Sequence, residues 1–126
     1  MGITLMYGDF LDAYPNVAVH LVNLGGTLPF ILERLEGIAA SRNIPGPEPR
    51  ERLRRLYFDC ASLGPRALEM AAKVIGADRI MLGTDYPIFQ PNLLEDVVAK
   101  AELSDAERRM VVSGTAQSII DRLGRY

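Results

Sequence analysis

The sequence has little of several features that mark specialised classes of protein. Its 126 residues include one cysteine, one histidine and no tryptophan. A single cysteine, Cys60, excludes an intramolecular disulfide and favours a reducing compartment, so we expect a cytoplasmic protein. No apolar run approaches the roughly 18 residues that span a bilayer, and the first residues lack the basic region of a secretory signal. We therefore expect no membrane association and no secretion.

The charge balance also lacks an excess of either sign. Fourteen Lys and Arg stand against 16 Asp and Glu, which gives a net charge of −2. This balance does not favour nucleic acid as a partner, because nucleic-acid binders carry basic patches. Apolar residues make up 48% and charged residues 24% of the chain, as in folded globular domains. We expect a single domain over residues 1–126.

The apolar residues form three short runs that are typical of buried strands, residues 17–22, 56–58 and 79–82. Each run is followed by a turn and then by a helical pattern. A loop with three prolines covers residues 43–50, and Ser104 to Glu107 forms a capping box. The expected helices start near residues 28, 65, 92, 104 and 115. A repeated strand–loop–helix order predicts parallel strands with right-handed crossovers.

The length decides between two architectures of this α/β class. A complete (β/α)₈ barrel takes about 250 residues, roughly twice the length of this chain. Three parallel strands with flanking helices would therefore form either a small open α/β domain or a partial (half) TIM barrel. A parallel sheet needs cover on both faces, so the second architecture needs something else to close it.

Functional groups of parallel α/β folds gather where strands end and loops begin. Asn23, Asp59 and Asp85 follow the three predicted strands. Carboxylates there can bind a metal or act as bases, and the pair Gly25 and Gly26 would let the backbone approach a ligand. Each has a structural alternative: Asp85 could cap its loop, Asp59 could stabilise the turn after it, and the glycines could serve the turn.

The remaining candidate groups favour structural roles. Side chains alternate along a strand, so if Asn23 faces a site, His20 faces the helix layer and is a packed core histidine. Cys60 is then a small buried residue. The arginine-rich segment 48–55 could bind an anion, but a solvated helix face with i,i+4 ion pairs is favoured.

These same segments resemble the amidohydrolase-related family, the branch that includes aminocarboxymuconate-semialdehyde decarboxylase and resorcylate decarboxylase. The resemblance covers Asn23-Leu-Gly-Gly-Thr-Leu-Pro-Phe30 with Arg34, Leu56-Tyr-Phe-Asp59, and residues 75–87. The last segment, Gly-Ala-Asp-Arg followed by Gly-Thr-Asp-Tyr-Pro, is the most specific. The match extends in order over nearly the whole chain and corresponds to the C-terminal part of the family's barrel.

The resemblance implies a metal-dependent TIM barrel that hydrolyses or non-oxidatively decarboxylates a small carboxylated or cyclic substrate, commonly with zinc. Asp85 matches the family's metal-binding aspartate. Asn23 occupies the position of its acid/base histidine, and Arg34 matches an arginine of the following helix. We expect Arg34, Gly25 and Gly26 to lie on the substrate side of such a site.

The departures from the family pattern bear on activity. The family's other metal ligands, a His-x-His pair on the first strand and a histidine on the fifth, have no match here. Asn23 cannot exchange a proton near neutral pH, so at the histidine position it is non-functional as a base. Ser-Gly-Thr-Ala at residues 113–116 stands where the family has Gly-Asn-Ala. One carboxylate makes a poor zinc site, so we expect a lone chain to be inactive, with no bound metal as one possibility.

Two functional hypotheses remain open from the sequence. The chain is either an enzyme part, completed by an N-terminal barrel half or by a second copy, or a non-catalytic remnant that keeps the fold as a binding module. Exposed strand edges would favour association in both cases, and a homodimer is the simplest form. A third possibility is a fragment of a longer protein.

Overall fold

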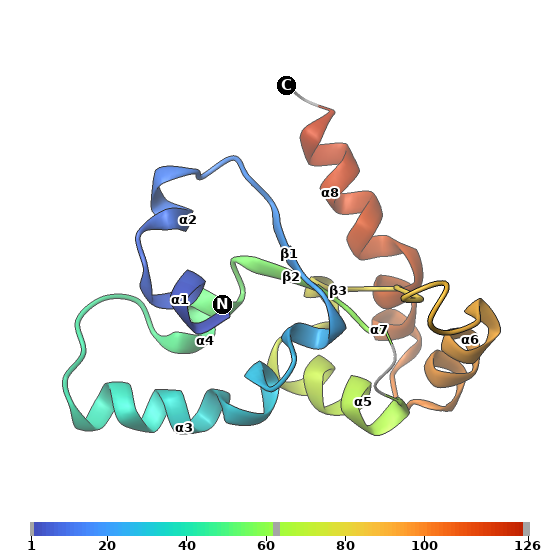
Figure 1. Ribbon diagram of the computed structural model, residues 1–126, viewed down its shortest axis with the longest axis horizontal. Helices are drawn as coiled ribbons and strands as arrows, with labels where there is room; N and C mark the ends of the chain where they lie inside the picture. Colours follow the sequence, from blue (N-terminus) through green and yellow to red (C-terminus); the bar gives the residue numbers. More distant parts are fainter. Residues whose placement is uncertain (1, 62–63, 125–126) are drawn as a thin grey trace.

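A parallel three-stranded sheet forms the centre of the molecule (Figure 1). The computed structural model describes residues 2–61 and 64–124. The strands β1 (Val19–Leu21), β2 (Leu56–Asp59) and β3 (Ile80–Met81) lie in that order, with β2 in the middle. Leu21 pairs with Phe58, and Phe58 pairs with Ile80. The expected α/β class, with three parallel strands and flanking helices, is confirmed.

Two short helices precede β1, and further helices follow each strand. Three of the helices have proline as their first residue, where a missing N–H costs no intrahelical bond. In chain order the helices are α1 (Gly2–Tyr7), α2 (Phe10–Ala13), α3 (Leu28–Ser41), α4 (Pro49–Leu53), α5 (Pro65–Val74), α6 (Pro91–Lys100), α7 (Asp105–Arg109) and α8 (Thr115–Leu123). The capping box at Ser104 is confirmed, because its hydroxyl accepts from the Glu107 N–H. Short 3-10 turns cover Asn23–Gly25 and Ala77–Arg79, and a π-helical turn, Met110–Gly114, joins α7 to α8. None of the described helices is long and apolar enough to cross a membrane.

The first face of the sheet is the core. Leu56, Phe58 and Ile80 lie on this face and are fully buried. Apolar side chains from α3, α5 and α6 belong to the same buried cluster, among them Leu32, Leu68 and Leu94. Figure 1 shows α3 and α5 running along one side of the sheet. Burial of these side chains fixes the register of the sheet, because a slip by one residue would turn them to the other face.

The second face carries His20, Tyr57 and Asp59, which alternate with the core residues. The expectation that His20 faces the helix layer is therefore wrong. The alternation itself holds within β1, but it cannot be extended to Asn23, because β1 ends at Leu21 and Asn23 has a positive φ of 54°. The His20 side chain is 42% exposed, and Val22 is also exposed.

The arginines of segment 48–55 do not form the expected i,i+4 pairs. Arg50 donates to Glu36 of α3 at 2.9 Å and to the Val74 carbonyl at 2.6 Å. Arg54 donates to Asp78, in the turn before β3, at 2.8 Å. These contacts join segments more than 13 positions apart in the chain, so the cluster holds α4 to the rest of the fold instead of forming a solvated face.

Candidate functional site

The Asp59 carboxylate connects the loops at the carboxyl end of the sheet. Its Oδ1 accepts from the backbone N–H groups of Asn23 and Ala61, both at 3.0 Å. The side chain also packs against Gly83, where an added Cβ would lie 2.7 Å from the Asp59 Cβ. Asp59 therefore holds the loop after β1, its own loop and the loop after β3 together. The expected turn-stabilising role of Asp59 is confirmed by its bond to Ala61.

His20 and Asp59 form an imidazole–carboxylate pair on the second face. His20 Nε2 lies 2.8 Å from Asp59 Oδ2, and only 10% of the Asp59 side chain is exposed. With the proton on Nε2 donated to the carboxylate, Nδ1 carries the lone pair and can accept a proton or bind a ligand. A hollow of about 320 Å³ opens beside His20, lined also by Val22 and Gly25. A histidine that a carboxylate orients in this way can serve as a general acid or base.

Asp85 lies on the loop after β3 and is exposed. Its φ is 54°, and its carbonyl accepts from the Ile88 N–H at 2.8 Å. The neighbouring Thr84 hydroxyl accepts from the Tyr86 N–H at 3.3 Å. The turn is thus held by the Asp85 carbonyl and the Thr84 hydroxyl, and no hydrogen bond or ion pair of the Asp85 carboxylate is found among the described residues.

The other sequence candidates lie around the loop after β1. Gly25 has a φ of 71°, and an added Cβ would lie 2.9 Å from the Phe58 ring, so this glycine is required by packing. Gly26 has a φ of 67° with open space at its Cβ position, which leaves its backbone accessible. Arg34 is exposed on α3. Asn23 is connected to the site through its backbone, by the N–H that Asp59 accepts.

The described residues do not by themselves form a metal site. No group of three or more His, Cys, Asp and Glu side chains within residues 2–61 and 64–124 could hold an ion. Catalytic zinc normally has three protein ligands and one open position. Asp85 could supply one of them, and the remaining ligands would have to come from outside the described residues.

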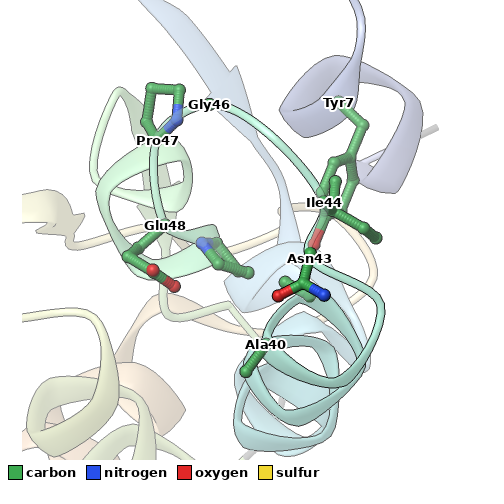
Figure 2. Close-up of a pocket in the computed structure, with 9 residues that line it drawn as sticks. Tyr7, Ala40, Asn43, Ile44, Gly46, Pro47 and Glu48 are labelled. Carbon is green, nitrogen blue, oxygen red and sulfur yellow. The ribbon is translucent and has the colours of Figure 1, made fainter.

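Two other features, a second hollow and the single cysteine, lack the groups of an acid–base site. A hollow of about 190 Å³ lies between α1 and the loop before α4. Figure 2 shows Tyr7, Asn43 and Glu48 among the side chains that line it. Glu48 is the one carboxylate among its lining residues, so the hollow has no acid–base pair. Cys60 is fully buried, and burial raises the pKa of its thiol above the ordinary value of 9.0. Its interpretation as a small buried residue is confirmed.

The pair of His20 and Asp59 is the part of the site that sequence reasoning missed. A strand pattern that continues past the end of β1 to Asn23 separates the two residues. The register His20 with Tyr57 was the missing information, since it places His20 and Asp59 on one face of neighbouring strands. The position of both residues near the carboxyl ends of parallel strands was the available signal.

Comparison with known proteins bears on the family. The family model described as amidohydrolase matches residues 4–122. Among curated relatives, 2-amino-3-carboxymuconate-6-semialdehyde decarboxylase of Dictyostelium discoideum is 26% identical over 120 residues, which cover 90% of this chain and 33% of the relative. The 6-methylsalicylic acid decarboxylase of Penicillium expansum is 28% identical, and its match covers 94% of this chain and 39% of the relative. Gamma-resorcylate decarboxylase of Polaromonas is 27% identical, with 93% and 38% covered.

Solved structures share the fold. The 2,6-dihydroxybenzoate decarboxylase of Rhizobium superposes with a TM-score of 0.82 at 21% identity, and the match covers 95% of this chain and 39% of that one. Dihydroxybenzoic acid decarboxylase of Polaromonas, solved with manganese and 2-nitroresorcinol, gives a TM-score of 0.81 at 23% identity over 95% of this chain and 38% of that one. The chain thus spans between a third and two-fifths of the length of the curated relatives above.

Proposed function

Because the chain belongs to the amidohydrolase family, we propose that it contributes the carboxyl edge of a metal-dependent decarboxylase site that another polypeptide segment completes. The observation that carries this proposal is the Asp59 carboxylate, which holds three strand-end loops at one edge of the sheet. The decarboxylases among the relatives favour decarboxylation over hydrolysis. The substrate class that we propose is a small carboxylated, aromatic or cyclic compound.

Within this proposal, Asp85 supplies one carboxylate ligand to a divalent metal. The resemblance to the family favours zinc, and manganese in a solved neighbour makes it the second ion to test. Because Asp85 is exposed, its carboxylate is accessible to a metal ion whose other ligands come from another segment. Arg34, Gly25 and Gly26 would contact the substrate from the loop after β1 and the start of α3.

His20, not Asn23, is the residue of this edge that can move a proton. Asn23 has no titratable side chain, whereas the His20 imidazole is oriented by Asp59 and adjoins a hollow. In this proposal Asn23 keeps a structural role, since its N–H positions the loop on Asp59.

The completing segment covers the second face of the sheet. Strands β1 and β3 are edge strands, and the exposed His20 and Val22 side chains lie on this face. Either a complementary N-terminal barrel half or a second copy of the chain could cover it. The second copy would bring another His20 and Asp59, whereas the N-terminal half would bring the family's histidine ligands. In this proposal residues 1–126 form a single domain that corresponds to the C-terminal part of the family barrel, and the single Cys60 favours a reducing compartment such as the cytoplasm.

Decarboxylation of 2,6-dihydroxybenzoate tests this proposal. The purified chain alone, with Mn²⁺ or Zn²⁺, should release no CO₂ above background. Co-expression with the N-terminal part of the Polaromonas relative should give turnover that Asp85→Asn abolishes and Glu95→Gln, an exposed control on α6, retains. Turnover by the chain alone as a monomer would contradict the shared site, whereas turnover by a dimer would identify the second copy as the completing segment.

A non-catalytic remnant is the second candidate, and Thr115 is the observation that favours it. Thr115 lies in the segment that departs from the family pattern, is fully buried, and donates to the Ala77 carbonyl at 3.0 Å. That contact serves the fold alone. If co-expression yields a complex without turnover, the non-catalytic function replaces the shared decarboxylase site as the proposal.

A further inference from the structure

A cavity of about 240 Å³ lies at the amino end of the strands, opposite the edge that carries Asp59 and Asp85. Arg54 and Arg55 directly precede β2, and Arg79 directly precedes β3. Arg122 reaches the same cavity from the last turn of α8. Four guanidinium groups therefore line one small cavity, at the end of the sheet that the proposed decarboxylase site does not use.

The arginines are only partly neutralised by the described carboxylates. Arg54 pairs with Asp78 at 2.8 Å, and Arg55 pairs with Asp12. The Nε atom of Arg79 lies 3.5 Å from Oδ2 of the same Asp78. This Nε is buried and has no hydrogen-bond partner among the described residues. Among the described residues, four positive groups thus face two carboxylates, which leaves an excess of two positive charges around the cavity.

Two of these arginines contact a single aromatic ring. The Arg79 guanidinium carbon lies 5.2 Å from the centroid of the Tyr57 ring, and that of Arg122 lies 5.7 Å from it. The ring attracts both cations, but it does not cancel the repulsion between them. An anion in the cavity would offset that repulsion, and guanidinium groups match the paired oxygens of carboxylates and phosphates.

Hydrocarbon side chains and two tyrosine rings form the rest of the lining, and among them Tyr14 and Val17 are exposed. Leu11, Tyr14, Pro15 and Val17 complete the wall together with Tyr57. A bare inorganic ion would leave this surface unused, whereas an aromatic or aliphatic body would cover it. Small-molecule sites typically combine apolar walls with a few polar groups that fix orientation.

We infer that this cavity is a binding site for a small aryl oxyanion, whose carboxylate or phosphate the arginines bind and whose ring packs against the exposed Tyr14 and Val17 side chains. The volume limits the ligand to roughly one aromatic ring with its charged group. The site lies at the opposite end of the strands from the proposed decarboxylase edge, so the purified chain should bind the ligand without that edge being completed.

Isothermal titration of the full chain with benzoate and with phenyl phosphate tests this inference and distinguishes the two oxyanions. At least one should bind saturably and more tightly than inorganic phosphate, and neutral phenol should not bind. Arg122→Gln should weaken binding by about tenfold or more, since it removes one charged hydrogen-bonding partner. Arg122 lies at the exposed end of α8 and has no carboxylate partner among the described residues, so this variant should fold.

The control is Arg109→Gln, which removes the same charge from exposed α7 outside the cavity lining. It should bind like the unmodified chain, and Arg122→Lys should restore part of the affinity. No saturable binding of either aryl oxyanion would overturn the inference. Equal weakening by Arg122→Gln and Arg109→Gln would also overturn it, because the binding would then follow net charge alone. Asp85→Asn should leave the affinity unchanged, which separates this result from the fate of the proposed decarboxylase function.

Discussion

Replacement of Asp59 is the most informative perturbation of the candidate site. Asp59→Ala removes the acceptor of two backbone N–H groups, those of Asn23 and Ala61. A buried donor left without a partner costs about 1–3 kcal/mol, so two donors should lower the free energy of unfolding by about 2–6 kcal/mol. That is a large part of the roughly 5–15 kcal/mol that stabilises a typical domain.

The pair with His20 should contribute much less to this loss. The His20 side chain is 42% exposed, and solvent screens such pairs to about 1 kcal/mol or below. We therefore expect His20→Ala to be nearly neutral. Asp59→Asn keeps one carbonyl oxygen for the two N–H groups and should fall between the two alanine variants.

Urea denaturation followed by circular dichroism measures these differences. All variants should be compared at one protein concentration, because association would make the midpoint depend on concentration. A loss below about 0.5 kcal/mol in Asp59→Ala would refute the role of this carboxylate in holding the loops, since surface substitutions fall in that range. A large loss in His20→Ala would show instead that the imidazole is the structural partner.

Three further predictions concern buried groups. Thr115→Val removes a hydroxyl donor from a buried carbonyl and should lower the free energy of unfolding by about 1–2 kcal/mol, measured by urea denaturation. Cys60 is buried and the pKa of its thiol is raised, so a thiol reagent at pH 8 should modify it only at the rate of unfolding; immediate reaction would contradict its burial. The Glu102 N–H and the Arg66 guanidinium hold the pKa of Glu69 below its ordinary value of 4.5. The stability from Glu69 is therefore present above that value and lost as the pH falls through the lowered folded pKa, and Glu69→Gln should reduce the fall of the urea midpoint on acidification.

The order of strands and helices could be predicted from the sequence because it depends on local patterns. Apolar runs, prolines at helix starts and the capping box at Ser104 each specify one segment, and the structure contains these elements. The helices α1 and α2 were not predicted, since they are short and have no strong apolar period. The expected strand over residues 17–22 is longer than β1 at both ends, and just beyond it Asn23 and Leu24 adopt positive φ angles that no local pattern indicates.

The arrangement of the candidate site could be predicted only in part. Asn23, Asp59 and Asp85 were identified because each follows a strand, and the structure places the first two in direct contact. The pair of His20 and Asp59 depends on the register between β1 and β2, which a single sequence does not specify. The partners of Arg50 and Arg54 likewise lie on distant segments. Contacts of this kind depend on tertiary packing, and the periodicity of apolar residues along the chain does not predict them.

Metal content tests the central claim, that the chain holds only part of a metal site, most directly. The chain would be purified without a histidine tag, dialysed against trace zinc or manganese, and analysed by elemental mass spectrometry. We expect far less than one metal ion per chain, with the same value for Asp85→Asn, because one carboxylate does not retain a divalent ion. Close to one ion per chain that Asp85→Asn removes would contradict it and would show that this chain completes the site on its own.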